Sequence, residues 1–466
     1  MREPTATNFA AIAALLGFAA ATFAPQIFHD ADTWWHLAAG KWILAHQTVP
    51  ARDIFTYTFA GQPWSAHEWL AEVAMALAFL AAGWSGLHIL FGLAFGATAW
   101  IMAHALRRRL DVTPALLVTV MGLACVAGSL LARPHLLALP LLALWTASLI
   151  EAREQDRAPP LWLALVMLVW ANLHGGFAFG LALAAALALE AIFASGDKSE
   201  TLRQWGLFFG ASVLAAIVTP QGLDGLLFPF RLLLMPGLAS VGEWAPSDLI
   251  HLSPFPITLL AMLFVLATGK LRLSISRAAL ILALTYLALS HSRHVMLFGI
   301  AAPLLAAPAM ATAWPGKPES SRSGVVGAAL ALACLLLMAR LMFPAERGED
   351  RVSPVAALAA VPKSVRSEPV LNAYDYGGYL IFNGVEVFID GRTDMYPTDF
   401  LNQDDRINAG DSAAIAAALS AHHVIWTIFP AASSTVKALD RLPGWHRLHA
   451  DANAVVHVKD QPPPPG

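Results

Sequence analysis

Long apolar runs separated by short polar segments fill most of the first 343 positions. A helix needs about 20 apolar residues to cross a bilayer, and eleven runs approach that length: 8–28, 86–106, 113–131, 135–150, 160–173, 176–194, 204–219, 254–269, 275–290, 294–313 and 324–343. The pattern predicts an α-helical polytopic membrane protein with about eleven transmembrane helices. A further run, 69–82, is shorter, and we expect it to lie at the membrane surface.

The composition agrees with a membrane protein. Of 466 residues, 57% are hydrophobic and only 13% are charged, against about 25% charged in soluble domains. The net charge of −3 gives no reason to expect nucleic acid as a partner. Cys125 and Cys334 lie inside apolar runs, so we predict no disulfide or cysteine metal site. The first apolar run has spanning length and no clear cleavage site, so we interpret it as a retained helix rather than a signal peptide.

The basic residues predict an orientation. With a cytoplasmic N-terminus and a surface-lying 69–82, thirteen basic residues face the cytoplasm and five face outward, as the positive-inside rule requires. The cytoplasmic set is Arg2, Arg107, Arg108, Arg109, Arg153, Arg157, Lys198, Arg203, Lys270, Arg272, Arg277, Lys317 and Arg322; the outer set is Lys41, Arg52, Arg133, Arg231 and Arg293. After an odd number of crossings the C-terminal segment lies outside. We therefore predict a protein of the bacterial inner membrane with a periplasmic C-terminal domain.

The domain boundaries follow from composition. Residues 1–344 form the predicted transmembrane domain, with a long first outer loop, 29–85, and a Pro- and Gly-rich, re-entrant-like loop, 219–253. Residues 345–460 lack a spanning run and alternate between strand and helix patterns, which predicts a small soluble α/β domain. Its expected strands are Pro369–Asn372, Glu386–Asp390, Val424–Phe429, Trp445–His449 and Val455–Val458, and its expected helices start at Asp375 or lie near 412–420 and 434–440. The Pro-rich tail 461–466 is predicted to be disordered.

The first outer loop holds the densest group of chemically active residues. Between His29 and Glu72 lie five carboxylates, four histidines and five tryptophans. If a helix begins near Trp34, Asp32 and His36 share one face by i,i+4 spacing. Asp30 or Asp32 is then a candidate general base, which the adjacent His36 could orient; capping of that helix is the alternative role.

The same loop also contains possible metal ligands. Asp32 and His36, together with Glu68 or His67, are residue types that could bind a divalent cation such as magnesium or manganese. Glu68 is alternatively a helper of the base, or simply a solvated residue in an interfacial belt. His36 and His67 are also candidates for contact with a sugar or an acceptor.

Further clusters fall on the predicted outer face. Arg133 and His135, with Arg293 and His294, place cations beside the membrane. They are candidates for holding a phosphate or pyrophosphate, for which arginine offers a bidentate fork; interfacial anchoring is the alternative. His174, Glu243 and Trp244 are candidates for contact with the acceptor or the sugar, while His174 alternatively satisfies a helix end.

Together these features resemble the type C glycosyltransferases, the superfamily of the dolichyl-phosphate-mannose–protein mannosyltransferases and the oligosaccharyltransferases. The likeness covers roughly residues 8–313, and the family's catalytic aspartate after the first helix matches Asp30 or Asp32. Two features depart from the family: Arg133-Pro134-His135 stands where a second acidic residue is usual, and His67-Glu68-Trp69-Leu70 replaces a Lys-Pro-Pro of some members.

The resemblance implies an inverting membrane glycosyltransferase. It would take a sugar from a polyprenyl-phosphate donor and pass it to a hydroxyl of an extracytoplasmic glycan, lipid or protein of the cell envelope. Two alternatives remain open. One is a non-enzymatic protein, either a flippase for lipid-linked glycans or an envelope assembly scaffold, and the other is an O-antigen-ligase-like transferase that uses a pyrophosphate-linked glycan.

The C-terminal domain carries one more pattern. The segments 372–380, with Gly377-Gly378, and 388–394, with Asp390, Arg392 and Asp394, resemble a pattern in bacterial membrane proteins to which no activity is attached. They predict either a glycan-binding surface or a buried structural Asp–Arg pair.

Overall fold

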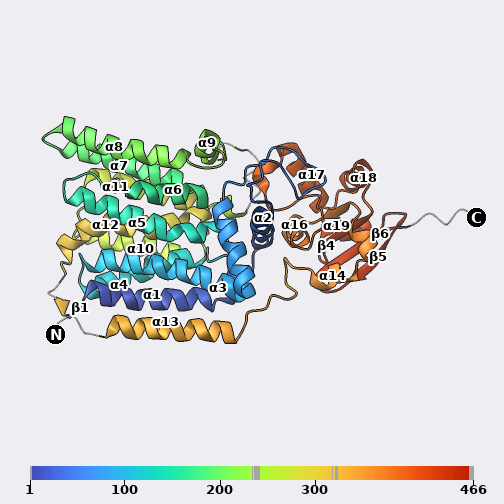
Figure 1. Cartoon of the computed structure of the whole chain (residues 1–466), viewed down its shortest axis with the longest axis horizontal. Helices are drawn as coiled ribbons and strands as arrows, with labels where there is room; N and C mark the ends of the chain where they lie inside the picture. Colours follow the sequence, from blue (N-terminus) through green and yellow to red (C-terminus); the bar gives the residue numbers. More distant parts are fainter. Residues whose placement is uncertain (1–2, 233–234, 236–241, 317–318, 321–323, 461–466) are drawn as a thin grey trace, which may run out of the picture. The chain divides into compact units, whose positions relative to one another are not determined.

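A computed structural model describes residues 3–232, 235, 242–316, 319–320 and 324–460 (Figure 1). The chain divides into two compact units, and we describe each by itself. The helical unit comprises Met1–Ile27, Ser85–Leu234 and Ala239–Ala345, and the mixed unit comprises Phe28–Trp84, Met235–Leu238 and Glu346–Gly466. The predicted disordered tail 461–466 and part of the 219–253 loop lie outside the described residues.

The helical unit is a bundle in which α12 packs against α4, α5 and α11, while α8 packs against α6 and α7 (Figure 1). Its elements are α1 (Ala6–Thr22), the later part of α3 (Trp69–Arg107), α4 (Val112–Ala127), α5 (Pro134–Glu154), α6 (Leu163–Leu173), α7 (Phe177–Ala194), α8 (Lys198–Ile217), α9 (Leu223–Leu232), η3 (Gly242–Trp244), α10 (Pro254–Ala267), α11 (Ile275–Ser290), η4 (Ser292–His294), α12 (Val295–Ala313) and α13 (Val325–Met342), with a two-residue pairing of β1 (Glu3–Pro4) and β2 (Glu319–Ser320).

Each of the eleven predicted apolar runs coincides with a helix. By length and composition, five helices in the described part of the chain could cross a membrane: Trp69–Arg107, Pro134–Glu154, Phe177–Ala194, Ser292–Ala313 and Val325–Met342. Most of the other apolar helices of the bundle are shorter than 18 residues. The membrane-protein class is thus supported, and the count of about eleven crossings stays a prediction.

Helix α3 contains a break that separates two predicted elements. Ala82 (φ −151°, ψ 27°) and Gly83 (φ 56°, ψ −140°) leave helical geometry, and glycine tolerates the positive φ without a Cβ penalty. The break lies between the predicted surface segment 69–82 and the predicted span 86–106. The boundary between the two units falls beside it, at Trp84 and Ser85.

The mixed unit is built on a four-stranded sheet of order β3-β4-β6-β5. Strand β3 is parallel to β4, and the other neighbours are antiparallel. The strands are β3 (Val370–Asn372), β4 (Trp426–Pro430), β5 (Trp445–Ala450) and β6 (Ala454–Lys459); the helices are η1 (Pro25–Phe28, at the junction of the units), α2 (Asp32–His46), α14 (Val355–Ala360), α15 (Lys363–Arg366), α16 (Tyr374–Phe382), η5 (Thr393–Met395), α17 (Thr398–Asn408), α18 (Ser412–Ala421) and α19 (Ser434–Leu439). The predicted α/β character of the C-terminal segment is confirmed.

One predicted strand is wrong. Residues 386–390 do not join the sheet. Instead the Val387 N–H donates to the carbonyl of Phe55 (3.2 Å), and the Tyr57 N–H donates to the carbonyl of Val387 (3.3 Å). The backbone of Val387 is therefore satisfied by the first outer loop, while the Phe388 N–H donates to Asn372 Oδ1 (2.9 Å). A local strand pattern does not reveal these long-range pairings.

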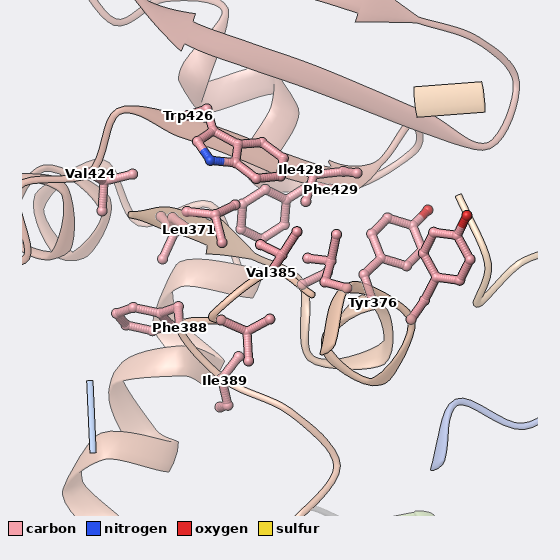
Figure 2. Close-up of a cluster of buried hydrophobic side chains, with 14 of the residues drawn as sticks. Leu371, Tyr376, Val385, Phe388, Ile389, Val424, Trp426, Ile428 and Phe429 are labelled. Carbon is pink, nitrogen blue, oxygen red and sulfur yellow. The ribbon is translucent and has the colours of Figure 1, made fainter. Parts of the chain in front are cut away.

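The first outer loop and the C-terminal segment share one hydrophobic core. Figure 2 shows its part around β3 and β4, with Leu371, Phe388 and Trp426 among the buried side chains. Trp34, Trp35 and Trp64 of the first loop belong to the same cluster. Burial of such aromatic rings is a major stabilising contribution. The domain division made from the sequence placed this loop with residues 1–344, whereas its contacts group it with residues 346–460.

Asp404 makes the stability of the mixed unit dependent on pH. This α17 residue is only 5% exposed; Asn408 Nδ2 donates to its Oδ2 (2.9 Å), and Oδ1 has no partner among the described residues. Burial raises the pKa of the Asp404 carboxyl to about 7, and the charges of Asp405 and Asp375 add to the effect. Because the unfolded pKa is about 3.9, the folded state binds the extra proton between these values, so stability is highest near pH 4 and falls as pH rises through 7.

We therefore expect the mixed unit to lose up to about 4 kcal/mol of stability between pH 4 and pH 8 through this group, and Asp404→Asn to abolish that loss. Hydrogen exchange of the β4 amides at pH 4 and pH 8, corrected for intrinsic rates, measures the difference. The exposed neighbour provides the control, since Asp405→Asn should keep most of the wild-type pH dependence. An unchanged pH dependence in Asp404→Asn would contradict the assignment.

Candidate functional site

The first-loop carboxylates lie at the start of α2. The N-cap position of this helix is Ala31, and neither aspartate occupies it. Asp32 lies in the first helical turn, where the exposed N–H groups favour a negative charge. Asp30 is 5% exposed, and its backbone carbonyl accepts a hydrogen bond from Arg347 Nη2 (3.3 Å). Asp32 is less buried than Asp30, so its carboxylate is the better placed of the two to meet a substrate.

His36 is buried between the two glutamates of the next segment. Its Nδ1 lies 3.3 Å from Glu72 Oε1, and its Nε2 lies 3.9 Å from Glu68 Oε2. The ring packs on Trp35 with a centroid distance of 3.6 Å. His67 Nε2 lies 3.9 Å from the other oxygen of Glu68. The structure thus brings Glu68, His36 and His67 together; the helper role of Glu68 stays a prediction.

This group does not fit the predicted magnesium or manganese ion. The predicted ligands were Asp32 and His36 with Glu68 or His67, and a magnesium ion needs its ligand atoms at about 2.0–2.1 Å; Glu68 turns one oxygen toward His36 and the other toward His67, each at 3.9 Å. Within the described ranges, no three or more His, Cys, Asp or Glu side chains are arranged to hold a metal ion. No step of the reaction proposed below is routed through a metal.

Arg392 is fully buried in an ionic cluster of the mixed unit. Its Nε and Nη2 donate to the two oxygens of Asp390 (2.9 and 2.6 Å), and its Nη1 lies 2.8 Å from Asp53 Oδ1. Tyr396 also donates to Asp390 (3.0 Å). Burial lowers the pKa of Arg392, but Asp390 and Asp53 outweigh it and the net shift is upward. For Asp390 and Arg392 the geometry favours the structural pair over a glycan-binding surface.

One member of this neighbourhood, Asp53, was assigned no role from the sequence. Asp53 accepts hydrogen bonds from the backbone N–H and the hydroxyl of Thr56 (3.0 and 2.6 Å). The three-residue spacing between Asp53 and Thr56 could have predicted this local turn, but not the ion pair of Asp53 with the distant Arg392. Asp394, which the sequence grouped with Asp390 and Arg392 as a possible glycan-binding residue, is also buried. Burial raises the pKa of its carboxyl, against the opposing charges of His67 and Arg392.

A second cluster lies within the helical unit, where the two candidate arginines share one carboxylate. Arg133 Nη1 lies 3.3 Å from Glu243 Oε2, and Arg293 Nη1 lies 3.3 Å from Glu243 Oε1. The Arg293 guanidinium also stacks over the Trp244 ring at 4.4 Å. All four side chains are partly exposed. The structure therefore joins Arg133, Arg293, Glu243 and Trp244, which lie far apart in the sequence.

The candidate histidines lie around this cluster. The rings of His135 and His174 are 6.2 Å apart, and the ring of His294 is 6.1 Å from Trp244. His135 Nε2 lies 2.8 Å from the carbonyl of Ser129. His174 Nδ1 accepts from the Gly176 N–H (3.0 Å) at the start of α7, which fits the helix-end role considered for it. Hydrogen bonds from Ser292 to the backbone of Glu243 and Ala245 hold η3 beside η4.

Three solved structures similar to this chain are of one archaeal oligosaccharyltransferase, from Archaeoglobus fulgidus. The apo form has a TM-score of 0.57 at 10% identity, covering 90% of this chain and 69% of that chain. The complex of this enzyme, AglB, with an inhibitory peptide and a dolichol-phosphate gives 0.56 at 11% identity, with the same coverage. The form tethered to an acceptor peptide gives 0.54 at 11%, covering 97% and 74%.

The sequence comparisons were negative: no protein-family model matches the chain, and no curated protein is significantly similar to it. At 10–11% identity the structural likeness concerns the fold. It agrees with the resemblance drawn from the first outer loop. The chain is therefore similar in fold to archaeal oligosaccharyltransferase, a member of the type C glycosyltransferase superfamily.

Proposed function

We propose that this protein is an inverting glycosyltransferase that moves a sugar from a polyprenyl-phosphate donor to a hydroxyl of an extracytoplasmic acceptor. The observation that carries the proposal is the likeness to an oligosaccharyltransferase over 90% of the chain. A dolichol-phosphate is bound in one of those archaeal structures and an acceptor peptide in another, which supports a lipid-linked donor. The mixed unit would act in the periplasm, as the distribution of basic residues predicts.

The proposed chemistry is a single displacement. Asp30 or Asp32 takes the proton of the acceptor hydroxyl, the acceptor oxygen forms a bond to the anomeric carbon, and the bond from that carbon to the phosphate oxygen breaks. The polyprenyl phosphate leaves with the electron pair, and the anomeric configuration inverts. Glu68 would assist through its contacts with His36 and His67. A positioned base typically contributes about 10²–10⁴ to the rate.

Binding of the departing phosphate is assigned to the helical unit. Arg133 and Arg293, with His135 and His294 nearby, would hold the donor phosphate. In the structure both arginines pair with Glu243, and a carboxylate spanning two guanidinium groups is a geometric analogue of a phosphate in the same place. Contact with acceptor or sugar is assigned to His36, His67, His174, Glu243 and Trp244.

The test is transfer from a panel of radiolabelled donors. Purified protein in nanodiscs would be incubated with several polyprenyl-phosphate sugars and with envelope extracts as acceptor, and loss of lipid-bound label would be followed with and without EDTA. We expect label to leave the lipid for one donor with wild type, and background release with the double variant Asp30→Asn/Asp32→Asn. Asp248→Asn, an exposed aspartate outside both clusters, is the matched control and should behave as wild type.

The other results discriminate the remaining candidates. If the protein were active only with pyrophosphate-linked glycans, these would replace polyprenyl-phosphate sugars as the donor. That result would favour an O-antigen-ligase-like transferase. Equal activity of the double variant and wild type would refute the base assignment. If label were released from neither donor class but lipid-linked glycan moved across the bilayer, the flippase would be favoured.

A further inference from the structure

The C-terminal segments 372–380 and 388–394 have no role in the reaction proposed above. Within the mixed unit, however, they lie against the first turn of α2, because α16 packs along that helix. Both segments are notable for glycines at contact positions: Gly377 and Gly378 in α16, and Gly391 between Asp390 and Arg392.

Gly391 lies directly against the carboxylate of Asp32. A Cβ atom built on Gly391 would overlap Asp32 Oδ1, would lie 2.9 Å from Asp32 Cγ, and would lie 3.1 Å from Trp35 Nε1. Gly391 is not among the glycines with positive φ. The effect of a Cβ here would therefore be steric: the Asp32 carboxylate occupies the volume that the Cβ would fill, so this flexible side chain would be displaced.

The segment that carries Gly391 is rigidly held. The Arg392 N–H donates to Asp390 Oδ1 (2.9 Å), and the Asp390 N–H donates to Tyr396 Oη (3.0 Å). The buried Arg392 side chain ties the same segment to Asp53. Because these groups are desolvated and paired, moving the segment breaks charged hydrogen bonds. Asp32, rather than Gly391, would have to move if a side chain were added.

The glycine pair of α16, Gly377 and Gly378, lies against the residues that flank the contact between Gly391 and Asp32. A Cβ on Gly378 would lie 2.5 Å from the carbonyl of Ala31, the residue before Asp32, and a Cβ on Gly377 would lie 2.7 Å from Asp390 Cα. The two glycines let the α16 backbone approach the start of α2 and the Gly391 segment at once.

A buried donor lies beside this contact. The indole N–H of Trp35 has no hydrogen-bond partner among the described residues, although the side chain is buried. Buried polar groups are normally satisfied. The Trp35 indole nitrogen lies buried beside the carboxylate, and a Cβ on Gly391 would crowd both groups.

We propose that the Asp390–Arg392 segment, supported by α16, positions the carboxylate of Asp32, with Gly391 as the positioning residue; this rests on the proposed function. The C-terminal domain then contributes to catalysis by orienting the general base. Misplacement of a reacting group by about 1 Å can cost about 10²-fold in rate.

The experiment compares Gly391→Ala with wild type in the full-length protein, using the donor and acceptor found active. We expect kcat to fall about 10²-fold with the donor KM within about 2-fold, since donor binding is assigned to other residues, and the acidic limb of the kcat–pH profile to move. Gly348→Ala is the matched control, because a Cβ there meets nothing within 4 Å, and it should behave as wild type.

Two further variants separate positioning from folding. Leu371→Ala weakens the core of the same unit; it should lower the unfolding midpoint and leave kcat per folded molecule and the pH profile unchanged. Asp32→Glu keeps a carboxylate but makes the side chain longer, so the carboxylate no longer fits beside Gly391. This variant should lose activity while remaining folded. The inference would be overturned if Gly391→Ala or Asp32→Glu kept the wild-type kcat. It would also be overturned if Leu371→Ala moved the pH profile. Neither result would affect the proposal that the protein is a transferase. An inactive wild type would overturn both.

Discussion

Asp32→Asn is expected to lower kcat by about 10²–10⁴-fold, the usual contribution of a positioned general base. Asparagine keeps the shape of the side chain but cannot accept the proton of the acceptor hydroxyl, and its contact with Gly391 leaves the backbone undisturbed. The donor KM should change little, because phosphate binding is assigned to Arg133 and Arg293. Initial rates of sugar transfer over a range of donor concentrations give both constants.

The neighbouring aspartate provides the comparison. The side chain of Asp30 is almost fully buried, so Asp30→Asn should act mainly on stability and cost less in kcat than Asp32→Asn. The reverse order of effects would transfer the base role to Asp30. Full activity in both single variants would remove the general-base assignment from this loop.

Arg392→Met is expected to destabilise the mixed unit by about 3–5 kcal/mol, the usual cost of leaving buried charges without their partner. Methionine has a similar length and packs with Phe55 and Trp64, over which the guanidinium lies. It leaves the carboxylates of Asp53 and Asp390 buried without the cation that both contact. Since domains are stable by about 5–15 kcal/mol, this one change should remove a large part of that margin. Hydrogen exchange of β3 and β4 amides gives the change in unfolding free energy.

Two controls test the cause. Arg447→Met removes an ion pair with Asp440 whose arginine side chain is 48% exposed, so it should cost less than about 1 kcal/mol. Combining Arg392→Met with Asp53→Asn and Asp390→Asn removes the uncompensated charge and should restore part of the lost stability. If Arg392→Met proves no more harmful than Arg447→Met, the buried cluster contributes little to stability.

Much of the local structure was predictable from the sequence. The eleven apolar runs coincide with helices, and the expected break after residue 82 falls at Ala82 and Gly83. Four of the five expected strands were found. These features depend on interactions between residues close in the chain, such as helical hydrogen bonds and side-chain periodicity, which a single sequence displays directly.

The candidate residues were predictable by type, but not by partner. Asp30, Asp32, Glu68 and the outer arginines were selected because ionisable groups next to a membrane are costly unless they have a use. The sequence offered no means of pairing Arg133 and Arg293 with Glu243. The predicted metal ligands do not form a metal-binding group, since among the described residues no three His, Cys, Asp or Glu side chains are arranged to hold an ion.

The sequence by itself determined the class of this protein: a helical membrane chain with an acidic first loop, basic clusters between the apolar runs and a small α/β C-terminal module. Only the tertiary structure decided that the first loop and the C-terminal segment share one core, that Asp53 pairs with Arg392, and that Gly391 lies against Asp32. The physical reason is the range of the interactions. Periodicity and composition follow from neighbours in the chain, whereas burial of aromatic rings and neutralisation of buried charge are settled by residues hundreds of positions apart.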